Sequence, residues 1–115
     1  MRFLVMVKAT KEWAGELPTA AMHAFNETLV RDGVLLAAEG LQPSSKGARI
    51  SYDGGKPTVT DGPFAETKEL VAGFWLLQAR SKEEVIERLS RAPFERGETV
   101  EIRPLFEAED FEGEA

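Results

Sequence analysis

The sequence predicts a single α+β domain in which two βαβ units build a four-stranded antiparallel sheet with both helices on one face, the ferredoxin-like arrangement. Three observations predict this fold. A chain of 115 residues is long enough for one packed core and too short for two. Its patterns follow the order strand, helix, strand, hairpin, strand, helix, strand. A strong turn signal, Asp53-Gly54-Gly55-Lys56, marks the small hairpin insertion. We place the domain at residues 1–106 and an acidic C-terminal tail at residues 107–115.

The first βαβ unit is predicted from a strand, a helix and a second strand at Arg2–Lys8, Pro18–Asp32 and Leu35–Leu41. The first strand is rich in Val, Leu and Phe, residues that suit a pleated sheet. In the helix, Met22, Phe25 and Leu29 are spaced on one face, and Gly33 is placed to end it.

The second half of the chain begins with the hairpin, predicted at Ala48–Tyr52 and Thr58–Thr60, and continues with strands at Val71–Ala79 and Thr99–Leu105. Between these strands a helix opens at Ser81. Ser81 and Glu84 have the spacing of a capping box. We expect the buried stripe of this helix to consist of Val85, Ile86 and Leu89, and Pro93 to stop it.

Charge and composition argue against several kinds of partner. The net charge is −6 and the basic residues are scattered rather than gathered in a stripe, so we expect no nucleic acid and no membrane as partner. The absence of cysteine excludes disulfides and thiolate chemistry. The apolar run near the N-terminus is too short for a signal-peptide core or a membrane span. We therefore expect a cytoplasmic protein.

The two strands expected at the centre of the sheet, Arg2–Lys8 and Val71–Ala79, are apolar on both faces. A sheet with one face in water normally alternates apolar with polar residues, as Thr99–Leu105 does. We expect the open face to carry Leu4, Met6, Trp75 and Leu77. Each large apolar side chain left in water would forfeit about 1.5 to 3 kcal/mol. The pattern therefore predicts a homodimer that pairs two sheets through their open faces.

The stretch that carries the most chemical information is Val59–Glu69, a turn-forming acidic loop between two apolar runs. Pro63 fixes its own φ and biases Gly62 to extended backbone, while Asp61 can accept backbone N–H bonds in the turn. Asp61-Gly62-Pro63-Phe64, with Glu39-Gly40-Leu41, Ala72-Gly73-Phe74 and Val100–Pro104, resembles the signature of the DGPF-domain branch of the YCII-like family. The resemblance spans nearly the whole chain. It implies a dimeric α+β barrel with a cleft between the sheet and the loops.

The resemblance also implies an acid-base pair of one His and one Asp, and His23 is the single histidine of the chain. At about 100° per residue, His23 falls well off the helix face that carries Met22, Phe25 and Leu29. Counted back from Gly33, the family's histidine aligns with Met22, one residue away. We therefore expect His23 to be a surface residue without a catalytic role.

Asp61 is the candidate acid-base residue, and a purely structural role as a turn cap is the alternative. An unperturbed Asp has a pKa of about 3.9, so a base that works near neutrality needs burial or a neighbouring carboxylate. Glu39 is the expected neighbour; within its apolar strand it lies either at an edge in water or facing a polar pocket. The remaining candidates for substrate binding are Phe64, Glu66, Lys68 and Trp75. Trp75 also suits the core or the dimer interface.

Other chemistries lack the residues that they need. One His and no Cys leave no zinc site, and the acidic residues lack the spacing of a calcium loop, so we expect no metal. Without a phosphate loop or a dinucleotide fingerprint we expect no cofactor. Two functions remain. One is a cofactor-independent enzyme in which Asp61 moves a proton on a small cyclic or aromatic metabolite. The other is a non-catalytic binding or regulatory protein, because DGPF-type proteins are similar to domains found beside extracytoplasmic-function sigma factors.

Overall fold

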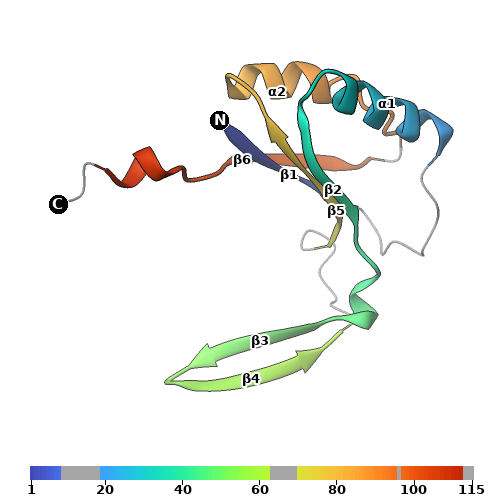
Figure 1. The fold of residues 1–115 in the computed structure, drawn as a ribbon. Helices are drawn as coiled ribbons and strands as arrows, with labels where there is room; N and C mark the ends of the chain where they lie inside the picture. Colours follow the sequence, from blue (N-terminus) through green and yellow to red (C-terminus); the bar gives the residue numbers. More distant parts are fainter. Residues whose placement is uncertain (9–18, 63–69, 96, 113–115) are drawn as a thin grey trace.

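The protein folds as an antiparallel sheet covered by two helices, with a separate hairpin that projects from it (Figure 1). The computed structural model describes residues 1–8, 19–62, 70–95 and 97–112. Four strands lie in the order β2-β5-β1-β6, and every neighbouring pair is antiparallel. Their bounds are β1 (Arg2–Lys8), β2 (Leu35–Gly40), β5 (Val71–Gln78) and β6 (Thr99–Pro104). This order is the one that two interleaved βαβ units produce, which confirms the predicted α+β topology.

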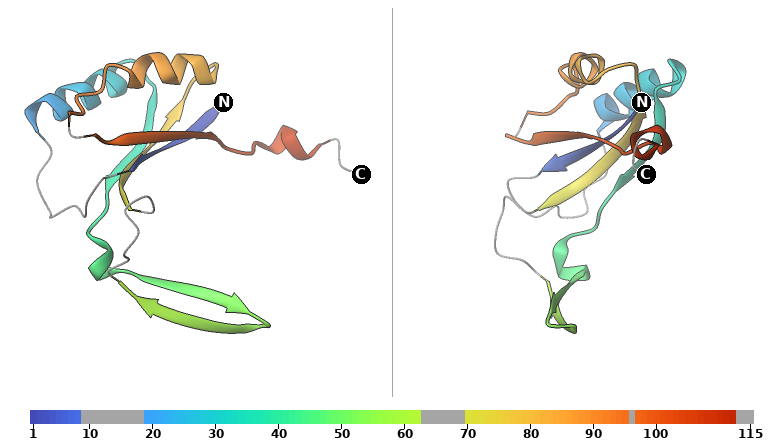
Figure 2. Two further views of the ribbon diagram at one scale, coloured as in Figure 1. Left: turned by 180° about the vertical axis from the view of Figure 1, so that it is seen from behind. Right: turned by 90° about the vertical axis from the view of Figure 1, so that its left-hand side faces the viewer.

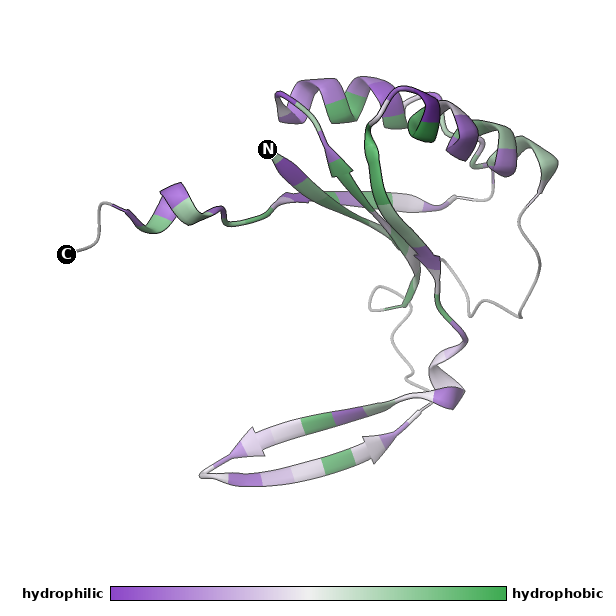
Figure 3. Ribbon diagram, viewed as in Figure 1, coloured by the Kyte–Doolittle hydropathy of each residue, from purple (hydrophilic) through white to green (hydrophobic). Residues whose placement is uncertain are grey.

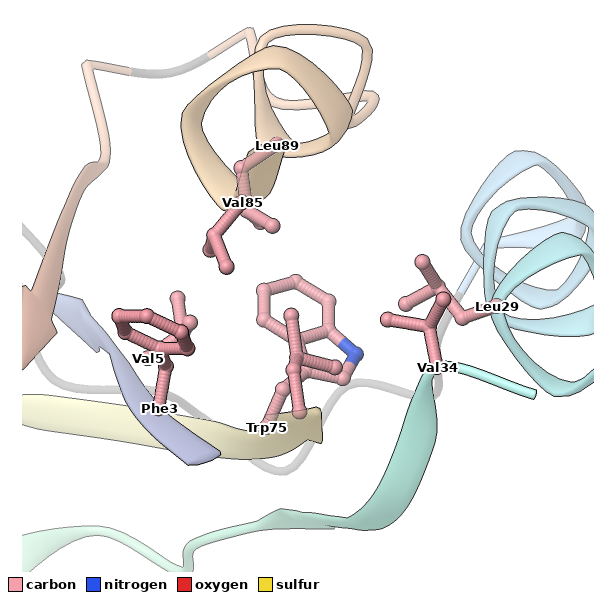
Figure 4. Packing of buried hydrophobic residues seen from close by; sticks show 8 residues of the cluster. Phe3, Val5, Leu29, Val34, Trp75, Val85 and Leu89 are labelled. Carbon is pink, nitrogen blue, oxygen red and sulfur yellow. The ribbon is translucent and has the colours of Figure 1, made fainter. Parts of the chain in front are cut away.

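The core lies between the sheet and the helices α1 (Ala20–Arg31) and α2 (Lys82–Leu89). Figure 4 shows side chains from both layers converging on the ring of Trp75. The buried residues of this cluster are Phe3, Val5, Leu29, Val34, Trp75, Leu77, Val85 and Leu89. Each of these large apolar side chains contributes about 1.5 to 3 kcal/mol when it is fully removed from water.

Local signals fix the ends of both helices. The Thr19 hydroxyl accepts a hydrogen bond from the Met22 amide at 3.1 Å, and Gly33 follows α1 at a φ of 70°, a left-handed conformation that favours glycine. The Ser81 hydroxyl accepts a hydrogen bond from the Glu84 amide at 3.2 Å, the first half of the predicted capping box. The prediction that Ile86 belongs to the buried stripe of α2 is wrong. Ile86 is 45% exposed because it lies one residue, about 100° of helix rotation, away from buried Val85.

The register of β1 and β5 corrects the predicted composition of the open face. Val5 lies opposite Trp75, and Phe3 lies opposite Leu77. Directly opposed residues share a face of the sheet. Trp75 and Leu77 therefore point to the helices, on the same face as buried Val5 and Phe3. The open face instead carries the apolar residues Leu4, Met6, Phe74 and Leu76, all partly exposed. The open face is apolar as predicted, but Phe74 and Leu76 lie there in place of Trp75 and Leu77.

The hairpin of β3 (Ala48–Asp53) and β4 (Lys56–Asp61) is a sheet of its own, which we call the arm. Its two-residue turn, Gly54-Gly55, has φ of 58° and 83°, as in the type I′ turn that matches the twist of paired strands. The 3-10 helix η1 (Ser44–Lys46) joins the arm to β2. In Figures 1 and 2 the arm lies far from the helices, beyond the ends of β2 and β5.

The C-terminal segment also leaves the body of the domain (Figure 1). It continues from β6 into the 3-10 helix η3 (Ala108–Phe111), whose Phe111 packs on Phe106 at a ring distance of 5.1 Å. Arg2 Nε and Glu107 Oε1 join this segment to β1 at 2.8 Å. The Cα radius of gyration is 16.6 Å, against about 13 Å for a compact domain of this length. Arm and C-terminal segment account for the extended shape.

Candidate functional site

Asp61 is the last residue of the arm, opposite Ala48, and is exposed in the single chain. Its carboxylate therefore lies at the end of the arm next to η1, which we call the root of the arm. The residues that follow it in the sequence signature, Phe64, Glu66 and Lys68 among them, lie outside the described residues. The prediction that Asp61 caps a turn also lies outside the described residues, because its carboxylate would accept hydrogen bonds from backbone amides of residues 63–69.

Gly62 fixes the root of the arm against the η1 turn. Its amide donates a hydrogen bond to the Gly47 carbonyl oxygen at 3.1 Å. A Cβ atom at Gly62 would collide with the backbone carbonyl of Ser44, so the two backbone segments cross where a side chain has no room. The position of Asp61 is therefore set by backbone packing on its C-terminal side.

Glu39 lies on β2 at the edge of the sheet, opposite Phe74 of β5, and is exposed. Of the two predicted alternatives, the structure places it at a strand edge in water. Its register puts the carboxylate on the open face, beside the apolar residues of β5 and β1. A Cβ atom at Gly73 would come within 2.8 Å of the Glu39 carbonyl oxygen, so this crossing also requires glycine.

Both candidate carboxylates thus sit on segments held by close glycine crossings, Asp61 beside Gly62 and Glu39 beside Gly73. Within the part of the chain that the structure describes, no hydrogen bond or ion pair joins Asp61 to Glu39. Their pairing stays a prediction. The sequence singled out Gly62 for the proline that follows it; its contact with Ser44, far back in the chain, had no local signal.

Trp75 is buried, with 4% of its surface exposed, and its indole N–H donates to Asn26 Oδ1 at 2.9 Å. Phe25 and Phe94 meet its ring edge to face, with centroids 5.9 and 6.0 Å away. The structure places this predicted substrate-binding residue in the helix-covered core, on the side of the sheet away from Glu39. Its packing accounts for the residue without a ligand.

His23 is exposed on α1, as its helix position predicts. The face of α1 that meets the core carries Leu29, with Met22 and Phe25 partly buried against it. His23 therefore lies on the helix layer, whereas Asp61 lies at the root of the arm. These positions are the ones expected for a surface histidine rather than an acid-base partner of Asp61.

Electrostatic perturbation is found at the helix layer instead. Arg88 Nη1 donates to Asp32 Oδ2 at 3.0 Å and ties the end of α1 to α2. This hydrogen bond from Arg88 holds the pKa of Asp32 below its usual value of 3.8. The pair is exposed and belongs to the surface of the fold. In residues 1–8, 19–62, 70–95 and 97–112, no three acidic or histidine side chains gather as a metal site would require.

Comparison with known proteins assigns the family. A family profile described as the YCII-related domain matches residues 1–109. The chain belongs to the YCII-related domain family. It is also 34% identical over 102 residues to an uncharacterised protein of Rhizobium meliloti (strain 1021), an alignment that covers 84% of this chain and 82% of the relative. Among the described helices of this YCII-related domain, none is long and apolar enough to cross a membrane.

Proposed function

We propose that this YCII-related domain, as a member of the DGPF-type branch, is a homodimeric α+β barrel that binds a small cyclic or aromatic metabolite and uses Asp61 as its acid-base residue. The observation that carries the proposal is the glycine crossing at Gly62, which leaves no room for a side chain and holds the residue before it in place. Fixing a carboxylate through backbone packing suits a residue that must meet a substrate atom, since productive geometry requires rigid support.

The open face of the sheet supports the dimer. Leu4 lies opposite Leu76, and Met6 lies opposite Phe74, so the four form a continuous apolar patch. Arg103 flanks this patch beside Leu4, and Glu101 flanks it beside Met6. An apolar centre with a charged rim is the composition of a protein interface. Glu39, opposite Phe74, borders the same patch, so a substrate site at this edge would lie against the second subunit.

In the proposed reaction Asp61 takes a proton from the metabolite and returns it at another atom, as in an isomerisation. No cofactor is needed for this step. Phe64, Glu66 and Lys68 follow Asp61 closely in the sequence and would contact the metabolite from the same loop. Glu39 is the second carboxylate of the proposed site and would contact the metabolite from the edge of the sheet.

The test separates the acid-base role of Asp61 from its structural role. Asp61→Asn keeps an acceptor oxygen of the same shape, so we expect a loss of stability of about 1 kcal/mol or less, whereas Asp61→Ala should cost about 1 to 3 kcal/mol if amides lose their partner. If Asp61 is the base, the asparagine variant folds and loses turnover, because an amide does not accept a proton at neutral pH.

The reaction is sought by incubating the wild type with a panel of small cyclic and aromatic acids and lactones, first by thermal shift and then by product analysis. Asp53→Asn is the matched control, since Asp53 lies at the other end of the arm, opposite Lys56. Turnover retained by a folded Asp61→Asn protein would end the catalytic proposal.

A non-catalytic binding protein is the second candidate. It is favoured by the exposure of both Asp61 and Glu39 in the single chain, because acid-base residues of enzymes normally lie in a cleft that excludes water. For such a protein we expect a metabolite of the panel to bind without forming product. The Asp61→Asn variant should bind it equally well.

A further inference from the structure

The strands of the arm are exposed to water along their whole length. Among the described residues, β3 and β4 form a two-stranded sheet of their own, and every residue of both strands is exposed. An isolated two-stranded hairpin is at best marginally stable in water. A favourable turn fixes the register of the arm, but a stable arm requires another surface to pack on.

The register divides the arm into two faces of different chemistry. One face holds the apolar row, which we define as Ile50, Tyr52, Pro57 and Val59. Ile50 is 52% exposed, Tyr52 76% and Val59 63%. The other face is polar throughout and carries Arg49, Ser51, Asp53, Lys56, Thr58 and Thr60. Figure 3 shows hydrophobic bands, coloured green, on both strands of the arm. This one-sided pattern is that of a strand pair that buries one face.

Asp61 lies on the same face as the apolar row. It pairs with Ala48, and the pairs Ile50–Val59 and Tyr52–Pro57 follow at intervals of two residues along both strands. Asp61 is the one charged residue on this face of the arm. Any surface that covers Ile50 and Val59 therefore approaches the carboxylate as well.

The exposed surface of the chain is large enough for a contact with a second copy. The chain exposes 8388 Å², whereas a compact monomer of 12.7 kDa is expected to expose about 6,200 Å². The excess of about 2,000 Å² is more than the roughly 800 Å² that each partner contributes to a standard interface. In a two-fold dimer, each arm covers its partner and is covered in return, so one contact satisfies both chains.

We infer that the apolar row of the arm packs on a second copy of this chain, so that the Asp61 site is completed between two subunits. This inference rests on the proposed homodimer and adds to its open-face contact a second contact area that includes the site. The partner's surface supplies the wall that Asp61 lacks in the single chain. Exclusion of water from around the carboxylate then strengthens its interaction with a bound substrate atom.

The test uses the absence of native cysteine. Single-cysteine variants Val59→Cys and Thr58→Cys place a thiol on the apolar row and on the polar face at neighbouring positions of β4. Both are treated with a thiol-reactive dye at protein concentrations that span the dimer dissociation constant measured by sedimentation. We expect labelling of Val59→Cys to slow by about tenfold or more in the dimer, because the thiol reacts only when the contact opens. Labelling of Thr58→Cys should stay unchanged.

A third variant combines Val59→Cys with Leu76→Glu, which places a charge on the open face. If this protein is monomeric and labels rapidly, the slow labelling of Val59→Cys is due to the second copy. A stable dimer in which Val59→Cys labels as fast as Thr58→Cys overturns the inference and leaves the open-face dimer standing. A wild type that is monomeric at every concentration overturns both. Slow labelling in the monomer also overturns the inference, since the chain itself would then cover the row.

Discussion

At the scale of single residues, the hydrogen bond between Trp75 and Asn26 gives a sharp test of the core. Asn26→Ala removes the acceptor of the indole N–H while the ring stays buried. An unsatisfied buried donor costs about 1 to 3 kcal/mol, so we expect the free energy of unfolding to fall by that amount in urea denaturation.

His23→Ala is the matched control, because it lies on the same helix and is exposed. Surface substitutions of this kind usually change stability by less than about 0.5 kcal/mol. Equal losses from the two variants would contradict the assignment of Asn26. Loss of ligand binding in His23→Ala would contradict the interpretation of His23 as a surface residue.

The Asp32–Arg88 pair predicts a dependence of stability on pH. The hydrogen bond from Arg88 lowers the pKa of Asp32 in the folded state, so the folded protein binds a proton there less readily than the unfolded chain. The contribution is therefore fully present above the usual pKa of 3.8 and is lost as the pH falls through the lower, folded pKa.

We expect Asp32→Asn to melt below the wild type at pH 6, and the difference between the two melting temperatures to shrink as the pH falls below about 4. Melting curves between pH 2 and pH 7, at about 0.1 M salt, measure this. A difference independent of pH would mean that the carboxylate acts through packing rather than charge.

Single residues also show where prediction from sequence stops. The buried position of Leu29 and the helix-capping role of Ser81 were predicted correctly, because a helix face and a cap are set by neighbours three or four residues away. Trp75 was placed on the wrong face, because alternation along one strand does not say which face it shares with another strand. The register supplies that information, through pairing with Val5 seventy residues away in the chain.

At the scale of elements, the root of the arm is a backbone contact that one methyl group should disrupt. Gly62→Ala places its Cβ on the Ser44 carbonyl, so either the η1 turn or the end of β4 must move. We expect a loss of about 1 to 3 kcal/mol and faster amide hydrogen exchange in the arm, measured by mass spectrometry.

Gly40→Ala is the control, because nothing lies within 4 Å of its Cβ position. We expect the exchange of the arm to stay at the wild-type rate in this variant. Slower or unchanged exchange in Gly62→Ala would mean that the crossing does not hold the arm.

The elements themselves were largely predictable. The bounds of β1 matched, and the hairpin followed from Gly54-Gly55, because a type I′ turn is encoded by its own residues. The separation of the arm from the main sheet was not predictable. Whether a hairpin joins a sheet depends on the path of the chain before and after it, which here passes through η1 and the crossing at Gly62.

At the scale of the whole molecule, the apolar open face and the extended shape both favour association with a second copy of the chain. The chain combines a helix-covered core with an apolar patch, an arm and a C-terminal segment that leave much more surface in water than a monomer of its mass exposes. Burial of the open face alone offers about 1.5 to 3 kcal/mol for each fully covered large side chain. A domain whose net stability is about 5 to 15 kcal/mol gains a large fraction of that from association.

Leu76→Glu tests this association directly, since Leu76 lies at the centre of the patch between Leu4 and Ala37. A charge buried in an apolar interface is costly, so we expect a dimer that buries about 1,200 Å² or more in the wild type to dissociate into monomers at micromolar concentration. Sedimentation equilibrium measures the change. Val30→Glu is the control, because Val30 is 62% exposed on α1, on the helix layer that the proposed interface does not use. Loss of the dimer in Leu76→Glu alone assigns the interface to the open face. Equal dissociation of both variants would place it elsewhere, and a Leu76→Glu protein that stays dimeric while the arm keeps its protection would make the arm, rather than the sheet, the principal contact between the subunits.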